Sequence, residues 1–351
     1  MQRFLLLSAA DQRLSFTQTA ERRGLVASSV EKDFWVCWTL GQLFSLPGLA
    51  SHLTFKGGTS LSKAWGLIDR FSEDIDLTIA RTVLGFGGES SPERAPSGKQ
   101  RAKRLKALKA ACRAYVEGPV KQALEERTVA VLGNNGWTLT LDADDPDGQT
   151  LLFNYPSHFQ VLEGRYVAPT VKIEFGARAD PWPTEARVIR PIVAEVLPQA
   201  FVNAGYPVQA LLPKRTFWEK AMLLHEETFR PANKPRRARM ARHYYDLHRL
   251  IEQGVGEDAS NDTELFAQAA QHRQVFFAQS WVDYTTLKPG TLRLAPLPEQ
   301  EASWREDYAA MQREMFSVAP PTFAAILATI GAFETQFNAR ALSRPVQPRA
   351  P

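Results

Sequence analysis

Leu53–Ile79 reads LTFKGGTSLSKAWGLIDRFSEDIDLTI, and this segment carries the strongest structural signal in the chain. Its first four residues are typical of a short strand, which Gly57-Gly58 interrupts. Thr59 and Ser60 then place hydroxyl groups near the start of a predicted helix, where backbone N–H groups attract phosphate. The segment therefore predicts a strand, a glycine turn and a helix suited to an anionic ligand.

The end of this segment alternates acidic and apolar residues. Ile75, Leu77 and Ile79 alternate with Asp74 and Asp76, which is the period of a strand buried on one face. Both carboxylates then point to the same side, roughly 7 Å apart along the backbone. Like charges so placed repel each other and need a cation, and hard oxygen ligands suit Mg²⁺. A phosphate-binding turn beside such a pair is what phosphoryl or nucleotidyl transfer requires.

These motifs resemble the AbiEii/AbiGii-type nucleotidyltransferase toxin family of type IV toxin–antitoxin and abortive-infection systems. The similarity rests on Lys56–Lys63 (KGGTSLSK), Arg70–Leu77 (RFSEDIDL) and the upstream Val30–Val36 (VEKDFWV). It extends over residues 25–255 and more loosely over Trp281–Asn338. The resemblance implies a core like that of DNA polymerase β and a reaction that uses an NTP with Mg²⁺ or Mn²⁺.

Predicted strands cluster between residues 53 and 195, and helical patterns dominate afterwards, which indicates an α+β protein. With the resemblance, we expect a polymerase-β-like core, a mixed sheet flanked by helices, and a helical C-terminal half. The expected divisions are N-terminal helices (1–50), the nucleotidyltransferase core (51–200), a helical domain completing the active site (201–341) and a disordered tail (342–351).

Bulk properties exclude several classes of protein. The 351 residues are 44% hydrophobic and 23% charged, as in ordinary globular proteins, and the net charge of +4 permits a nucleic-acid partner without requiring one. Cys37 and Cys112 lack CxxC spacing and are predicted to be buried free thiols. No signal peptide is recognisable, and no apolar run reaches the roughly 20 residues of a membrane span. We expect a cytoplasmic protein without a membrane partner.

Three further positions belong to the predicted catalytic site. Glu174 shares the polar face of a predicted strand with Lys172 and is the candidate third metal-binding carboxylate; the alternative is a solvated charge pair. The resemblance implies that Lys220 neutralises nucleotide phosphates, with Lys214 as the competing choice. It also implies that Asp246 orients Lys220 or binds a base, across the cleft from the acidic pair, against the alternative of a helix-surface charge.

The nucleotide is expected to bind the glycine turn and the helix after it. The predicted contacts are Gly57, Gly58, Thr59, Ser60, Lys63 and Lys220. The spacing is not the G-x-x-x-x-G-K-[ST] of a Walker A loop, so a P-loop NTPase is disfavoured.

Two basic clusters are candidate RNA-binding surfaces. Phosphate contacts supply affinity and register for RNA, and one cluster leads directly into the Asp246 motif. Its members are Arg236, Arg237, Arg239 and Arg242. The Lys99–Arg113 cluster coats a predicted helix and extends this surface, and for either cluster a solvated basic face is the alternative. Neither interleaves aromatic residues as a single-strand stacking platform does, which favours a structured RNA end.

Family members that this chain resembles modify the 3′ acceptor end of tRNA and so stop translation. The expected function is therefore a phage-defence toxin that transfers NMP from an NTP to an RNA acceptor, with tRNA as the first choice. A cognate antitoxin encoded nearby is also implied, and a stable complex with it is not required. Two alternatives remain: a nucleotidyltransferase acting on a protein or small molecule, and a non-catalytic nucleotide-binding module.

Overall fold

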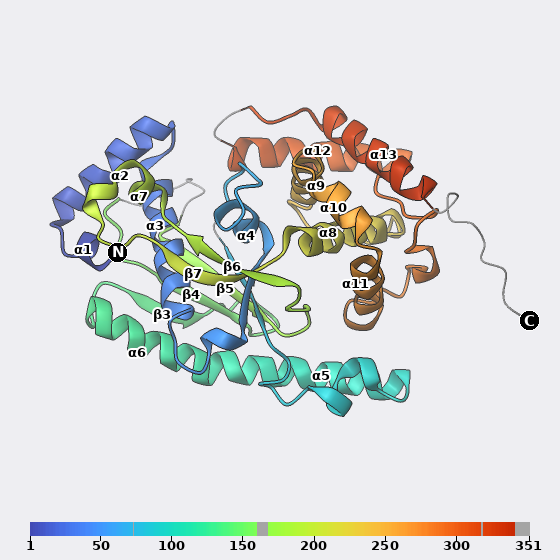
Figure 1. Cartoon of the computed structure of the whole chain (residues 1–351), viewed down its shortest axis with the longest axis horizontal. Coiled ribbons are helices and arrows are strands. Elements are labelled where there is room, and N and C mark those ends of the chain that lie inside the picture. Colours follow the sequence, from blue (N-terminus) through green and yellow to red (C-terminus); the bar gives the residue numbers. More distant parts are fainter. Residues whose placement is uncertain (73, 160–167, 317–318, 341–351) are drawn as a thin grey trace, which may run out of the picture. The chain divides into compact units, whose positions relative to one another are not determined.

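The computed structural model describes residues 1–72, 74–159, 168–316 and 319–340. The chain divides into two compact units, whose elements are labelled in Figure 1. Unit 1 comprises Met1–Gly66 and Phe71–Leu211, and unit 2 comprises Leu67–Arg70 and Leu212–Pro351. The tail predicted to be disordered, 342–351, lies outside the described residues.

Unit 1 is built on a mixed sheet. Among the described residues its strands are β1 (Leu53–Lys56), β2 (Ile75–Ile79), β3 (Thr138–Leu141), β4 (Thr150–Asn154), β5 (Thr170–Gly176), β6 (Thr184–Ile189) and β7 (Tyr206–Leu211). They lie in the order β3-β4-β5-β2-β1-β7-β6. The β2–β5 and β1–β7 pairs are parallel, and the other neighbours are antiparallel. This confirms the predicted α+β fold, and β7 carries the sheet past residue 200.

The strand β2 lies between β1 and β5 in the middle of the sheet. Ile75, Leu77 and Ile79 are all buried, as their alternation predicts. Asp74 comes directly before the strand, and Asp76 is its second residue. Because β2 is held by neighbours on both edges and by its buried side chains, the backbone beneath the acidic pair is firmly placed.

The helices in the described part of unit 1 are α1 (Gln2–Leu5), α2 (Ala9–Arg23), α3 (Ala27–Leu43), α4 (Gly57–Lys63), α5 (Gly98–Tyr115), α6 (Lys121–Leu132) and α7 (Ile192–Val196). α3 packs against β5 and β7, and Trp38 on it stacks on Phe153 of β4 at 5.5 Å between ring centroids. A π-helical turn containing Pro119 joins α5 to α6, and Figure 1 shows the two helices end to end. Cys37 and Cys112 are buried free thiols, as predicted.

Unit 2 is helical in its described part, which confirms the predicted helical C-terminal half. Its helices are α8 (Pro213–Thr228), α9 (Arg242–Glu252), α10 (Val255–Asn261), α11 (Thr263–Phe276), α12 (Pro298–Met315) and α13 (Phe323–Ala339). Trp218 on α8 packs edge-to-face on Phe266 of α11, and Tyr244 on α9 packs likewise on Trp304 of α12. These buried rings pack α8 on α11 and α9 on α12, and α8 also contacts α9.

None of the helices in the described ranges combines the length and the apolar character needed to span a bilayer.

Candidate functional site

The acidic pair in unit 1 lies beside a third carboxylate and a lysine. Asp76 is directly opposite Glu174 in the parallel β2–β5 pair and opposite Lys56 in the antiparallel β1–β2 pair. Directly opposed residues place their side chains on the same face of a sheet, so Asp76 and Glu174 share a face as expected. Asp74 is exposed and Asp76 is half-buried.

Lys172 partly neutralises this acidic face. Its Nζ lies 2.9 Å from Glu174 Oε1 and 3.6 Å from Asp142 Oδ2. Burial alone would lower the pKa of Lys172, but its hydrogen bond to Glu174 and the charges of Glu174 and Asp74 raise it above the ordinary value. The ammonium is therefore charged at neutral pH and engages Glu174.

The glycine turn closely approaches the acidic strand. Gly57 is the first residue of α4 and has φ +77°, a conformation that side-chain-bearing residues rarely adopt. A Cβ atom at this position would lie 2.0 Å from Asp76 Oδ2. Only glycine fits, because the Asp76 carboxylate occupies the space that a side chain would need.

The two hydroxyls of α4 have different surroundings. Thr59 is buried, and its Oγ1 donates to the carbonyl oxygen of Asp74 at 2.5 Å and lies 2.9 Å from Ser72 Oγ. This contact ties α4 to the chain just before β2. Ser60 Oγ is buried and has no hydrogen-bond partner among the described residues.

This arrangement fits a divalent cation bound by two carboxylates. Mg²⁺ is commonly held by one or two carboxylates and completes its shell with water and substrate phosphates. Asp74 and Asp76 supply hard oxygen donors, and the absence of a side chain at Gly57 lets the Asp76 carboxylate pack against the glycine turn. Within the described ranges, no cluster of three His, Cys, Asp or Glu side chains is arranged to hold an ion, and Glu174 pairs with Lys172 instead.

Lys63 has a protein partner inside unit 1. Its ammonium forms an ion pair with Asp33 of α3, and the other oxygen of Asp33 accepts the Ile192 N–H at 2.7 Å. Burial would lower the pKa of Lys63, but the charge of Asp33 and its hydrogen bond to Lys63 raise it above the ordinary value. The contact anchors α4 to α3, and the nucleotide-binding role of Lys63 stays a prediction.

Unit 2 contains a buried charge cluster centred on Asp246. Arg70 donates from Nε to Oδ1 at 2.6 Å and from Nη2 to Oδ2 at 2.8 Å, while Lys220 Nζ lies 2.8 Å from Oδ2. Burial alone would raise the pKa of Asp246, but Arg70 and Lys220 hold it well below the ordinary value. The structure thus brings together the predicted pair, Lys220 on α8 and Asp246 on α9.

His243 completes this cluster on the lysine side. Its Nδ1 lies 3.5 Å from Lys220 Nζ and accepts, because an ammonium can only donate. Burial and the charge of Lys220 hold the pKa of His243 well below its ordinary value, so the ring is neutral. Burial also lowers the pKa of Lys220. The charge of Asp246 raises this pKa, whereas the charge of Arg70 lowers it further. Two basic side chains, Arg70 and Lys220, thus share the single carboxylate of Asp246.

Sequence reasoning missed Arg70 and His243. Arg70 opens the RFSEDID motif, four residues before Asp74, yet pairs with a residue 176 positions away. Its place in the motif was the available signal. The competing lysine, Lys214, pairs with Asp262 at 2.6 Å and is half-buried, away from the Asp246 cluster's contacts.

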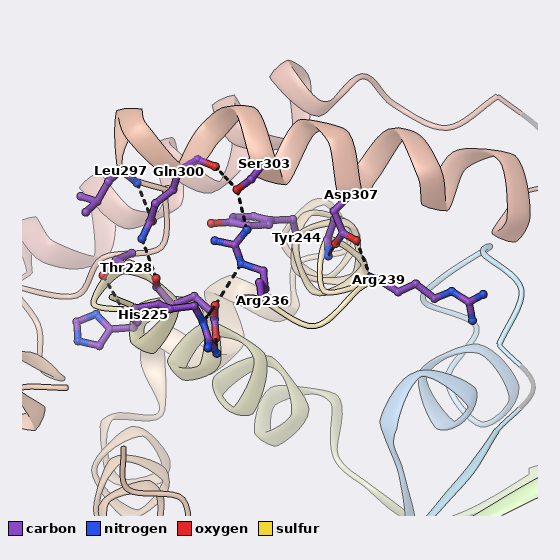
Figure 2. Close-up of polar contacts among 12 residues, drawn as sticks. His225, Thr228, Arg236, Arg239, Tyr244, Leu297, Gln300, Ser303 and Asp307 are labelled. Atoms are coloured by element: carbon purple, nitrogen blue, oxygen red, sulfur yellow. Dashed lines mark hydrogen bonds and ion pairs between the residues drawn. The ribbon is translucent and has the colours of Figure 1, made fainter. Parts of the chain in front are cut away.

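The predicted RNA-binding arginines fall into two kinds. Arg236 has partners on both α8 and α12. Its Nε is 3.2 Å from Glu227 Oε2 on α8. Its Nη1 donates to Ser303 Oγ on α12 at 3.0 Å, as Figure 2 shows, and its guanidinium lies 3.6 Å from the Trp304 ring centroid. Only 12% of its side chain is exposed. Arg236 is therefore largely committed to contacts within unit 2.

The other three arginines are more accessible. Arg237 and Arg239 are exposed and Arg242 is half-buried. Arg239 has φ +64°, and Asp307 on α12 accepts the backbone N–H groups of Arg239 at 2.6 Å and Ala241 at 2.7 Å. Figure 2 shows the Arg239 side chain pointing away from Asp307. One carboxylate thus holds the turn that precedes α9.

Comparisons with known proteins bear on this site. The model of the nucleotidyl transferase AbiEii toxin family, type IV toxin–antitoxin system, matches residues 38–329. The fold search finds the nucleotidyltransferase toxin MenT4 (Rv2826c) of Mycobacterium tuberculosis H37Rv, 16% identical over 97% of this chain and 91% of that one, with a TM-score of 0.45. It also finds JHP933 of Helicobacter pylori, 14% identical over 90% of this chain and 95% of that one, with a TM-score of 0.37. No curated protein matches.

The family model spans the glycine turn, the acidic strand, Lys220 and Asp246, and so confirms the resemblance found in the sequence. The chain belongs to the AbiEii family of nucleotidyltransferase toxins of type IV toxin–antitoxin systems, and it is a nucleotidyltransferase.

Proposed function

We propose that this enzyme transfers NMP from an NTP to an RNA, with the 3′ end of tRNA as the first candidate, and thereby blocks translation and growth. The acceptor hydroxyl oxygen bonds to the α-phosphorus, and the bond from that phosphorus to the oxygen bridging to the β-phosphate breaks. Pyrophosphate leaves with the electron pair, and the hydroxyl proton passes to solvent. The observation that carries the proposal is the approach of Gly57 to Asp76, which joins a side-chain-free turn to a carboxylate pair.

Asp74 and Asp76 are the proposed ligands of Mg²⁺ or Mn²⁺. A bound divalent ion would stabilise charge on the phosphates and orient the acceptor oxygen. Glu174 faces the same side of the sheet and is the proposed third ligand. Because Lys172 holds Glu174 at 2.9 Å, its recruitment requires that contact to open.

The nucleotide phosphates are assigned to Gly57, Gly58 and Ser60. The partnerless hydroxyl of Ser60 supports this assignment, because a ligand oxygen would satisfy it. For Thr59 we propose a structural role, because its hydroxyl already donates to the carbonyl oxygen of Asp74 and so holds α4 against the chain before β2. For Lys63 we propose an anchoring role, because its ammonium is already paired with Asp33.

Lys220 is the proposed phosphate-neutralising cation. Asp246 is completely buried, so we propose that it positions Lys220 and does not bind a base. Arg70 supports this role by holding both oxygens of Asp246. Lys214 is disfavoured, because Asp262 already neutralises it.

The acceptor phosphates are assigned to Arg237, Arg239 and Arg242, with Arg236 as a mainly structural member of the cluster. Family membership implies a cognate antitoxin. A tRNA acceptor would place the reaction in the cytoplasm.

The test is to incubate the purified enzyme with each labelled NTP in cell lysate. RNase-sensitive label supports the proposal, whereas protease-sensitive label would identify a protein acceptor and label in neither fraction a small-molecule acceptor. Asp76→Asn is the inactive control, and Asp144→Asn, which changes an exposed acid outside the site, should label like wild type. Absence of Asp76-dependent label with any NTP would leave only nucleotide binding.

A further inference from the structure

The helix α5 bears a dense positive charge that the proposed reaction centre does not use. Its 18 residues contain seven cations and no acid. They are Lys99, Arg101, Lys103, Arg104, Lys106, Lys109 and Arg113. Leu108 and Cys112 on the same helix are completely buried, so α5 is fixed to unit 1 by an apolar side.

Four of these cations form a stripe on the opposite side of α5. The stripe consists of Lys99, Lys103, Lys106 and Arg113, all exposed. At about 100° per residue they fall within an arc of about 80°, centred opposite Leu108. The stripe runs about 21 Å along the helix.

Little within the protein neutralises the stripe. Arg113 pairs with Glu117 at 2.6 Å, and Lys109 at its margin pairs with Asp147. In the part of the chain that the structure describes, no acidic side chain forms an ion pair with Lys99, Lys103 or Lys106. Like charges at i, i+3 and i, i+4 destabilise a helix, so the mutual repulsion of these cations lowers the stability of α5. An external anion would relieve the repulsion.

We propose that the α5 stripe is a docking surface for the phosphate backbone of the acceptor RNA. The inference rests on the proposed function, and it adds a second contact surface, in unit 1, to the arginines of unit 2. Charge complementarity identifies the partner as a polyanion. The stripe contains no aromatic side chain, so it reads phosphate without stacking on bases.

A membrane is the less suitable polyanion. Helices that bind the lipid interface expose an apolar face for insertion, whereas the apolar face of α5 is buried in unit 1. The lysines of the stripe are compact point charges on flexible stems, suited to sequence-independent phosphate contacts.

The experiment compares two triple variants of the full chain in the Asp76→Asn background, which removes catalysis from the binding assay. The test variant is Lys99→Gln/Lys103→Gln/Lys106→Gln. The matched control, Arg3→Gln/Arg22→Gln/Arg190→Gln, removes the same charge from exposed positions of unit 1 outside α5. Total tRNA binding is measured against salt, with vesicles of phosphatidylserine and phosphatidylcholine as a second probe.

We expect the test variant to lower the log–log salt slope by about 2 to 3, and the control to change it by less than about 1. In the catalytically active background, the test variant should raise KM for tRNA about tenfold or more and keep kcat. Equal slopes for the two variants would overturn the inference, as would a loss confined to vesicle binding. If wild-type label instead resides in protein, the proposed function fails regardless of the slopes.

Discussion

At the scale of single residues, the proposed chemistry rests on the acidic pair. Replacing Asp76 by Asn removes a proposed metal ligand but keeps the shape of the side chain beside Gly57. Loss of a positioned metal costs several kcal/mol of transition-state stabilisation, so we expect kcat to fall about a thousandfold or more. Asp74→Ala should act alike, with each chain folded as judged by circular dichroism. Near-wild-type turnover in folded Asp76→Asn would remove the metal assignment.

The cluster around Asp246 predicts different outcomes for its members. Lys220→Ala leaves Arg70 and Asp246 paired, so the chain should fold while nucleotide use drops strongly. Lys214→Ala breaks only a half-exposed pair and should be mild. Steady-state kinetics with varied NTP measure both. If Lys214→Ala proved the more damaging, the assignment of the phosphate-binding lysine would be wrong.

We expect the main effect of Asp246→Ala to be a loss of unfolding free energy. It leaves Arg70 and Lys220 buried without their anion, which costs about 3–5 kcal/mol. Urea unfolding should therefore show a large loss for Asp246→Ala but not for Lys220→Ala. Equal stabilities would mean that the buried charges are not coupled as the geometry indicates.

At the scale of elements, the segment before α9 contains one arginine with a structural role and others that we propose to bind RNA. Arg236→Ala removes the contacts with Glu227, Ser303 and Trp304, and we expect a loss of about 2 kcal/mol in unfolding free energy. Arg237→Ala should change the unfolding free energy by less than about 0.5 kcal/mol. It should reduce the slope of log binding constant against log salt concentration for RNA by about one. The reverse pattern, with Arg236→Ala altering only RNA binding, would contradict this division.

His225 on α8 makes the stability of unit 2 depend on pH. It is completely buried, accepts the Arg293 N–H at 3.0 Å, and burial lowers its pKa to about 4. The unfolded chain takes up a proton near pH 6.5, before the folded chain does, so stability falls as the pH drops. We expect His225 to account for a loss of about 2 kcal/mol between pH 7 and pH 5.

The measurement is urea unfolding of wild type and His225→Asn at both pH values. The variant should be less stable at pH 7 and show a pH dependence smaller by that amount. An unchanged dependence would assign the acid sensitivity to other groups.

At the scale of the whole molecule, the sequence predicted local features well and distant pairings poorly. The alternation of apolar and acidic residues predicted β2 and the position of the acidic pair correctly, because the two-residue period of a strand is visible in adjacent residues. The partners of Arg70 and Lys63 could not be read in this way, since Asp246 and Asp33 are distant in sequence. For the same reason the internal role of Arg236, which depends on Ser303 and Trp304, looked like surface charge.

The fit of Gly57 against Asp76 has a consequence for genetics. Cells that survive expression of a toxin carry copies that have lost activity, and every missense change of a glycine codon adds at least a Cβ atom. At Gly57 that atom would meet the Asp76 carboxylate, whereas at Gly24, which has a similar φ of +64°, nothing lies within 4 Å. Sequencing survivors that still produce full-length protein should therefore recover replacements of Gly57 repeatedly and of Gly24 rarely. Equal recovery at both glycines would show that backbone conformation alone, and not the proximity to Asp76, makes the position intolerant. A gene that selection keeps active should retain glycine at position 57 through long divergence.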